Sequence, residues 1–327
     1  MPNLAFLTDP GLRDGLLGRL QRVEARLSEA VKSDYPFVTA TSTHLVEAGG
    51  KRFRPLMTLL CAAFGDPDRE EVLDAATVVE LTHLATLYHD DVMDEAPLRR
   101  GRQSANSRWD NSVAILTGDF LFSRASDILA DLGPEAVRIQ ARTFERLVTG
   151  QIRETVGPAD AEDPVAHHLQ VLADKTGSLI ATSAQFGAMF AGCDPVVIDT
   201  LTRYGERIGV AFQLADDLVD LTSDSSKSGK TPGTDLKEGV PTLAGLMVLR
   251  TSAAEDARLG DLLTRPLSDA EVTEALALLR EHAAVQEARA VARYWADEAR
   301  ACLETLPAGA PRDALAAVCD YVVDRTG

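Results

Sequence analysis

Two clusters of aspartates share one spacing and lie among apolar residues. The first is DDVMD, which begins at residue 90, and the second is DDLVD, which begins at residue 216. Residues four apart share one face of a helix, where two carboxylates repel each other slightly. A divalent cation reverses that repulsion, and Mg²⁺ typically combines a few carboxylates with phosphate oxygens of a substrate. The candidate metal ligands are Asp90, Asp91, Asp94, Asp216, Asp217 and Asp220.

Cations lie close in sequence to these acids. GGKRFRP supplies Lys51, Arg52 and Arg54 just before a predicted helix, whose amides also favour a phosphate. Arg99 and Arg100 follow the first aspartate cluster. One exposed Lys or Arg is usually only a solvated side chain, and one acidic cluster arises by chance about once in so acidic a chain. The convergence of two acidic clusters with several cations favours a site for small phosphorylated molecules. Other candidate residues are His83, Lys175, Thr176 and Lys230.

The motifs GGKRFRP, DDVMD with RRG, DKT, FQLADDLVD and GKTPGTDLKEG occur in that order and resemble those of the trans-prenyltransferases that make polyprenyl diphosphates. The resemblance implies an all-helical fold around a deep central cavity, with the two aspartate motifs facing each other across its mouth. It also implies a homodimer. The implied reaction is the head-to-tail condensation of an allylic diphosphate with isopentenyl diphosphate.

The same resemblance implies roles for single residues. Asp90, Asp94 and Asp216 would ligate Mg²⁺, three ions per active site with Mn²⁺ as a substitute, and the other three aspartates would support them. With these three aspartates, Arg99 and Lys175 would form the catalytic set. The isopentenyl diphosphate pocket would contain Lys51, Arg54, His83 and Arg100. The allylic diphosphate would be bound by Arg99, Lys175, Thr176, Gln213 and Lys230.

One position departs from the family pattern. Many members carry a phosphate-binding Lys directly after the EG of DLKEG, and this chain has Val240 there. Lys237, three residues earlier, is a candidate replacement.

Small residues below the first aspartate cluster suggest a long product. Ala85 and Thr86 lie about one helical turn deeper than Asp90, and Thr82 lies one turn further. Short-chain members of the family place bulky aromatics there. We therefore expect a chain of hexaprenyl length or above, with geranylgeranyl or farnesyl diphosphate as the alternative. Two other interpretations are that small residues only permit close helix packing, and that Phe120 or Phe122 closes the tunnel from an opposite helix.

Helices are expected to position all of these residues. Helical periodicity is nearly continuous, strand signals are scarce, and no linker with a shift in composition interrupts the chain. A capping box at Ser268 and Glu271 predicts the start of a late helix. The sequence thus predicts one all-α domain over residues 1–327, with a fraction of apolar residues (45%) that is ordinary for a globular protein.

Charge and cysteine content limit the partners and the location. The net charge of −17 argues against nucleic acid, and no apolar stretch is long enough to insert stably in a membrane. A long product could still be handed to a membrane. The four scattered cysteines and the lack of a signal peptide predict a cytoplasmic protein.

Two rival functions use part of the same pattern. A class I terpene cyclase needs only one such aspartate motif and no second diphosphate pocket, so GGKRFRP and RRG count against it. A non-catalytic regulatory subunit of a heteromeric synthase has no reason to keep both aspartate clusters.

Overall fold

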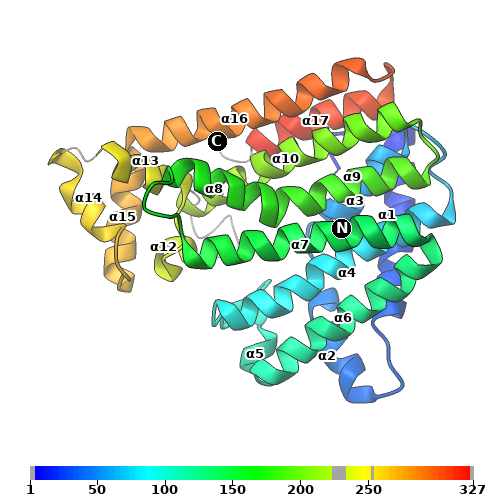
Figure 1. The fold of residues 1–327 in the computed structure, drawn as a ribbon, viewed down its shortest axis with the longest axis horizontal. Helices are drawn as coiled ribbons and strands as arrows, with labels where there is room; N and C mark the ends of the chain where they lie inside the picture. Colours follow the sequence, from blue (N-terminus) through cyan, green and yellow to red (C-terminus); the bar gives the residue numbers. More distant parts are fainter. Residues whose placement is uncertain (1–3, 223–232, 252–253, 325–327) are drawn as a thin grey trace. The chain divides into compact units, whose positions relative to one another are not determined.

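The computed structural model describes residues 4–222, 233–251 and 254–324. Across these ranges the chain is almost entirely helical (Figure 1), which confirms the predicted all-α fold. The strands within them are β1 (Leu98–Arg99) and β2 (Arg102–Gln103), an antiparallel pair. None of the helices described is long and apolar enough to cross a membrane.

The first seven helices, up to residue 156, are α1 (Pro10–Ala30), α2 (Pro36–Glu47), α3 (Phe53–Ala62), α4 (Glu70–Met93), α5 (Ala105–Arg108), α6 (Asn111–Leu132) and α7 (Pro134–Val156). The helical elements that follow are α8 (Pro164–Leu172), the π-helical turn η1 (Ala173–Gly177), α9 (Ser178–Phe190), α10 (Pro195–Thr222), α12 (Thr234–Glu238), α13 (Leu243–Thr251), the 3₁₀ turn η2 (Ala254–Asp256), α14 (Ala257–Leu262), α15 (Asp269–Glu281), α16 (Ala283–Cys302), the 3₁₀ turn η3 (Leu303–Thr305) and α17 (Ala310–Asp324).

Several helices begin at side chains that accept hydrogen bonds from the free amides of the first turn. Asp9 does so at the start of α1, with an N···O distance of 2.7 Å, and Asp110 at the start of α6, with 2.8 Å. The capping box of Ser268 and Glu271 opens α15, as predicted.

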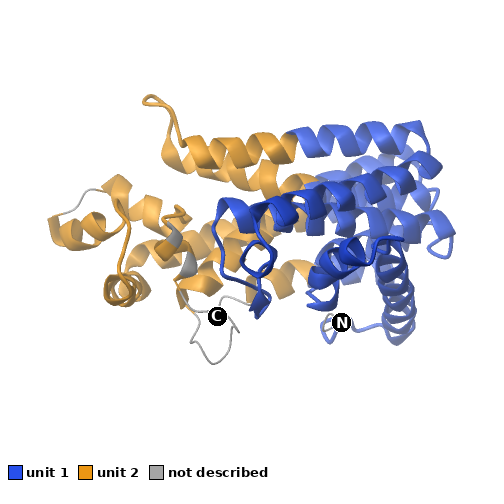
Figure 2. Ribbon diagram, turned by 90° about the horizontal axis from the view of Figure 1, so that it is seen from below, with its two compact units in different colours: residues 1–145, 179–205, 302–317 blue, residues 146–178, 206–301, 318–327 orange. Residues whose placement is uncertain are grey.

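The chain divides into two compact units (Figure 2). The first contains residues 1–145, 179–205 and 302–317, and the second contains residues 146–178, 206–301 and 318–327. The boundaries fall inside continuous helices such as α7 and α10. A single domain over residues 1–327 therefore stays a prediction.

Helix α4 is the central helix of the first unit, where it packs on α1, α3 and α6. All eight residues from Ala75 to Thr82 are buried. At 100° per residue these eight positions cover every face of a helix, so α4 is surrounded. Two of its acidic side chains lie inside the unit: the exposed fraction is 1% for Glu80 and 0% for Asp91.

In the second unit, a core of apolar side chains holds the C-terminal half of α10. Leu214, Leu218 and Leu221 of α10 belong to this core, together with Leu243 of α13 and Leu279 of α15. The spacing of these three leucines places them on one face of α10. The second aspartate cluster lies outside that face and is only partly buried.

Backbone contact between α9 and α3 in the first unit depends on a glycine. A Cβ atom added at Gly187 would lie 2.1 Å from the carbonyl oxygen of Thr58, so the two helices approach more closely than any side chain allows. At Gly18 on α1, an added Cβ would meet no atom within 4 Å.

We expect Gly187→Ala to lower the free energy of unfolding by about 1–3 kcal/mol, because α9 must move away from the backbone of α3. Gly18→Ala is the control and should raise it by about 0.5–1 kcal/mol, since alanine favours a helix over glycine. Urea unfolding followed by circular dichroism measures both. Equal effects of the two variants would contradict the close approach.

Candidate active site

The GGKRFRP motif forms a loop of unusual backbone conformation before α3. Gly49, Gly50 and Arg52 all have positive φ angles. A Cβ atom at Gly50 would lie 2.9 Å from Cζ of Arg100, so glycine makes room for that guanidinium. Arg100 donates hydrogen bonds to the carbonyl oxygens of Leu45, at 3.1 Å, and of Gly49. The loop and Arg100 therefore hold each other in place.

Arg52 has a different role from its neighbours in the motif. Its guanidinium is buried, lies 2.8 Å from the Glu80 carboxylate of α4 and also bonds to Glu24 of α1. It donates a further hydrogen bond of 3.1 Å to the carbonyl oxygen of Val46. Arg52 thus anchors the loop to two helices, whereas the sequence had grouped it with the phosphate-binding cations.

Arg54 and His83 lie in an excess of positive charge. Burial, together with Arg100, lowers the pKa of Arg54 to about 10, although Glu80 and Asp90 oppose this. Burial and the guanidinium groups of Arg54 and Arg100 also hold the pKa of His83 well below its usual range, so His83 is neutral at pH 7. Nε of Arg54 is buried and has no hydrogen-bond partner among the described residues. These features fit an anion site, and Lys51 is exposed on the adjoining loop.

A tight β-hairpin places Arg99 and Arg100 so that their side chains contact different parts of the first unit. Leu98 pairs with Gln103 and Arg99 with Arg102, which leaves Arg100 and Gly101 as a two-residue turn. Both turn residues have positive φ, as a type I′ turn requires. Arg100 reaches the GGKRFRP loop, and Arg99 reaches back to the end of α4.

Arg99 binds the first aspartate cluster. Its Nε lies 2.5 Å from Oδ1 of Asp91, and its Nη2 lies 3.7 Å from Oδ2 of Asp94. Burial raises the pKa of Asp91, and Arg99 opposes that shift. Asp90 is partly buried and Asp94 is exposed. Asp91 is fully buried, whereas Asp90 and Asp94, four residues apart, are accessible to solvent and are therefore the better candidates for metal ligands.

In the second unit, Asp235 of α12 adds a carboxylate to the second aspartate cluster. Its backbone amide lies 3.3 Å from Oδ2 of Asp220. Burial and then Asp235 raise the pKa of Asp217 well above its usual value, and Asp216 adds to the shift. Four carboxylates gathered in this way fit a divalent cation. Asp235 lies within the TDLKEG motif, but its sequence distance from residue 216 gives no sign that the two are neighbours.

Protein groups alone do not complete a metal site in the parts of the chain that the structure describes, where no three His, Cys, Asp or Glu side chains converge closely enough to hold an ion by themselves. Mg²⁺ in general leaves much of its coordination shell to water and phosphate oxygens.

The DKT motif adjoins the second aspartate cluster within the same unit. The hydroxyl of Thr176 donates to Oε1 of Gln213 at 3.0 Å, and Nε2 of Gln213 donates to Oδ1 of Asp217 at 2.9 Å. Nζ of Lys175 lies 2.5 Å from a carboxylate oxygen of Glu154. Two of the predicted ligands of the allylic diphosphate, Thr176 and Gln213, are therefore linked to this cluster, and Lys175 precedes Thr176 in the chain.

The remaining predictions near this cluster concern lysines. Lys230 falls outside the described residues. Lys237 is exposed and pairs with Asp269 of α15 at 2.6 Å, while Val240 follows the end of α12. Replacement of the missing family lysine by Lys237 stays a prediction.

The residues predicted to form the chain-length wall are in part engaged in helix packing. Thr82 accepts a hydrogen bond of 2.8 Å from Nε2 of Gln140 on α7. The carbonyl oxygen of Ala85 would lie 3.1 Å from a Cβ at Gly118 of α6, so α4 and α6 approach closely here. Thr86 donates to the carbonyl oxygen of His83.

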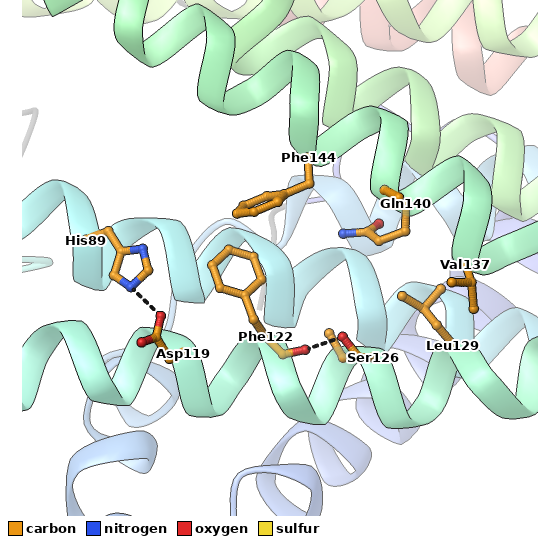
Figure 3. Close-up of a pocket in the computed structure, with 10 residues that line it drawn as sticks. His89, Asp119, Phe122, Ser126, Leu129, Val137, Gln140 and Phe144 are labelled. Carbon is orange, nitrogen blue, oxygen red and sulfur yellow. Dashed lines mark hydrogen bonds and ion pairs between the residues drawn. The ribbon is translucent and has the colours of Figure 1, made fainter.

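A cavity of about 420 Å³ lies beside these residues in the first unit (Figure 3). It begins near His89, which is next to Asp90 in sequence and lies 3.4 Å from Asp119. Phe122 and Phe144 line it and touch each other edge to face, with ring centroids 4.5 Å apart. The lining residues come mainly from α6 and α7 and do not include the three predicted wall residues: His89, Asp119, Phe122, Ala125, Ser126, Leu129, Val137, Gln140, Ala141 and Phe144.

We expect Arg52→Met to lower the free energy of unfolding by about 3–5 kcal/mol, because it leaves the Glu80 carboxylate buried without its guanidinium. The double variant Arg52→Met/Glu80→Met should recover part of the loss, since no charge then remains buried. Urea unfolding of the three proteins measures this. A loss of less than about 1 kcal/mol for the single variant would mean that the buried ion pair does not anchor the loop.

Comparison with known proteins identifies the family. The polyprenyl synthetase family model matches residues 35–279. Nonaprenyl diphosphate synthase of Mycobacterium tuberculosis is 50% identical over 94% of this chain and 91% of its own length. Dimethylallyltranstransferase of the same organism is 41% identical over 95% and 94%.

A solved structure agrees with these relatives. It is geranylgeranyl pyrophosphate synthase of Corynebacterium glutamicum complexed with calcium and isoprenyl diphosphate, which is 45% identical, with a TM-score of 0.87 and coverage of 98% of this chain and 99% of that one. The motifs, the helical fold and these likenesses together show that the chain belongs to the polyprenyl synthetase family and is a prenyltransferase.

Proposed function

We propose that this prenyltransferase condenses isopentenyl diphosphate with an allylic diphosphate in a Mg²⁺-dependent reaction. The observation that supports this most directly is the partly buried cluster of Arg54, Arg100 and neutral His83, close to Asp90. Guanidinium groups on one side and metal-binding carboxylates on the other suit two diphosphates held next to each other.

The residues divide between the two substrates. The isopentenyl diphosphate pocket is formed by Lys51, Arg54, His83 and Arg100. The allylic diphosphate is bound by Arg99, Lys175, Thr176, Gln213 and Lys230. Asp90, Asp94 and Asp216 would hold Mg²⁺, with Asp91, Asp217 and Asp220 as support. The metal, when bound, neutralises charge on the leaving diphosphate. Three ions per site and replacement by Mn²⁺ stay predictions.

The chain's own cations act on the developing charge. As the allylic C–O bond breaks, its electron pair leaves with the diphosphate, and Arg99 and Lys175 stabilise that charge. Arg54 and Arg100 hold isopentenyl diphosphate so that its C4 attacks the allylic carbon and forms the new C–C bond. A proton is then lost from C2, and the departing diphosphate accepts it. His83 can donate a hydrogen bond from its imidazole to isopentenyl diphosphate.

We further propose that the product is a long all-trans polyprenyl diphosphate whose apolar tail occupies the cavity of Figure 3. Phe122, Leu129, Val137 and Phe144 give that cavity an apolar lining beside the predicted wall. The 50% identity to a nonaprenyl diphosphate synthase supports a long chain. Geranylgeranyl diphosphate is the alternative, supported by the likeness to the Corynebacterium enzyme. Farnesyl diphosphate is the shorter option.

Assembly and location stay predictions. A homodimer is supported by apolar side chains that α6 exposes, Ile115 at 43% and Leu116 at 65%, since such residues often mark an interface. We expect the protein in the cytoplasm, with a long product passed on to a membrane.

The purified chain alone, given isopentenyl and farnesyl diphosphates with Mg²⁺, should form longer prenyl diphosphates, and EDTA should abolish turnover reversibly. Thin-layer chromatography of labelled products measures this. A cyclic hydrocarbon product would indicate a terpene cyclase. A lack of turnover until a second protein is added would indicate a regulatory subunit.

Filling the cavity should shorten the product. Ser126 and Ser123 are both exposed on α6, but only Ser126 lines the cavity. We expect Ser126→Phe to shift the chain length down by about one or more five-carbon units, because a phenyl ring occupies about the volume of one such unit. Ser123→Phe is the matched control and should leave the product unchanged. The same product from both variants and the wild type would exclude this cavity as the tail site.

A further inference from the structure

The DKT motif adopts a π-helical turn, η1, between α8 and α9. Such turns are rare, and they occur frequently at functional sites because the wider turn changes the direction of the side chains around it. A π-helical turn is less favourable than an α-helical one and therefore needs contacts that stabilise it. The turn contains Lys175 and Thr176, both assigned above to the allylic diphosphate.

Asp174 connects this turn to the surrounding helices. Its Oδ1 accepts a hydrogen bond from Nε of Arg146 on α7 at 3.1 Å, and its Oδ2 accepts one from Nε2 of Gln170 on α8 at 2.8 Å. Arg146 also lies 2.7 Å from Glu206 of α10. Asp174 is only 7% exposed, so its carboxylate is held on both oxygens in a largely dry environment.

Helix α7 also supports the turn through its backbone. A Cβ atom at Gly150 would lie 2.8 Å from the amide nitrogen of Lys175 and 3.0 Å from Cβ of Asp174. The hydroxyl of Ser178 donates to the carbonyl oxygen of Asp174 at 2.6 Å. Side-chain and backbone contacts thus fix the same five residues.

The turn directs the next two side chains away from Asp174. Lys175 reaches Glu154, and Thr176 reaches Gln213, which in turn binds Asp217 of the second aspartate cluster. A relaxation of the turn to an α-helix would change the register by one residue and rotate these side chains by about 100°.

We propose that Asp174 is a positioning residue that, through Arg146 and Gln170, keeps η1 in the register that presents Lys175 and Thr176 to the allylic diphosphate. The proposal rests on the proposed function for the identity of that ligand. Asp174 itself binds no substrate and acts only through the two residues that follow it.

Asp174→Asn tests the proposal, because asparagine keeps the shape of the side chain and removes its charge. We expect KM for the allylic diphosphate to rise and kcat to fall, together by about 10- to 100-fold in kcat/KM. KM for isopentenyl diphosphate should stay unchanged. Asp174→Glu should restore part of the loss.

Glu206→Gln is the matched control. It weakens the outer contact of Arg146 and leaves the Arg146–Asp174 pair in place, so we expect kcat/KM within about threefold of the wild type. Gln170→Ala is a second test variant at an exposed position, where folding is not at risk. It should change the kinetic constants in the same direction as Asp174→Asn, by a smaller factor.

Hydrogen exchange of the amides of residues 173–177 provides a readout that does not depend on turnover. We expect faster exchange there in Asp174→Asn than in the wild type and in Glu206→Gln. Lower thermal stability with unchanged exchange and unchanged KM for the allylic diphosphate would overturn the proposal. Absence of prenyl transfer by the wild type would instead contradict the proposed function, and the exchange data would still decide whether Asp174 fixes the turn.

Discussion

The burial of helix α4 on all sides is the constraint on which the first unit depends. A charge inside such a helix packing must meet a partner or shift its protonation. Glu80 meets Arg52, and Asp91 meets Arg99. His83 responds in the second way, with a pKa well below its usual range, whereas Arg54 keeps its charge although its pKa is lowered to about 10. The two ion pairs stabilise the fold, and we expect the cations around Arg54 to bind a ligand.

Buried charge also shapes the second unit, where the charges concerned are negative rather than positive. Its leucine core fixes the C-terminal half of α10. The polar side of that helix carries the carboxylates of Asp216, Asp217 and Asp220. Asp217 shows the consequence through its raised pKa, and Gln213 is the neutral group that links it to Thr176. A diphosphate alone would be repelled here, whereas a diphosphate with divalent cations would be attracted.

The all-α fold class and the two aspartate clusters could be predicted from local sequence, because helical periodicity and i, i+4 spacing are local properties. The anchoring role of Arg52 could not, since its partners Glu24 and Glu80 are 28 residues away on either side. The contribution of Asp235 to the second cluster and the register of η1 also arise from tertiary contacts. The small size of Ala85 had two interpretations, and its backbone contact with α6 favours close packing without excluding a role in chain length.

The two-residue hairpin turn at Arg100 and Gly101 fixes the positions of the two arginines of the RRG motif relative to each other. Because it is the shortest connection that an antiparallel pair allows, it fixes which arginine faces α4 and which faces the glycine loop. A one-residue insertion before the turn would move Arg99 to the loop side and leave Asp91 buried beside a different residue. The positions of both arginines therefore depend more on the number of residues in this turn than on the residues around it.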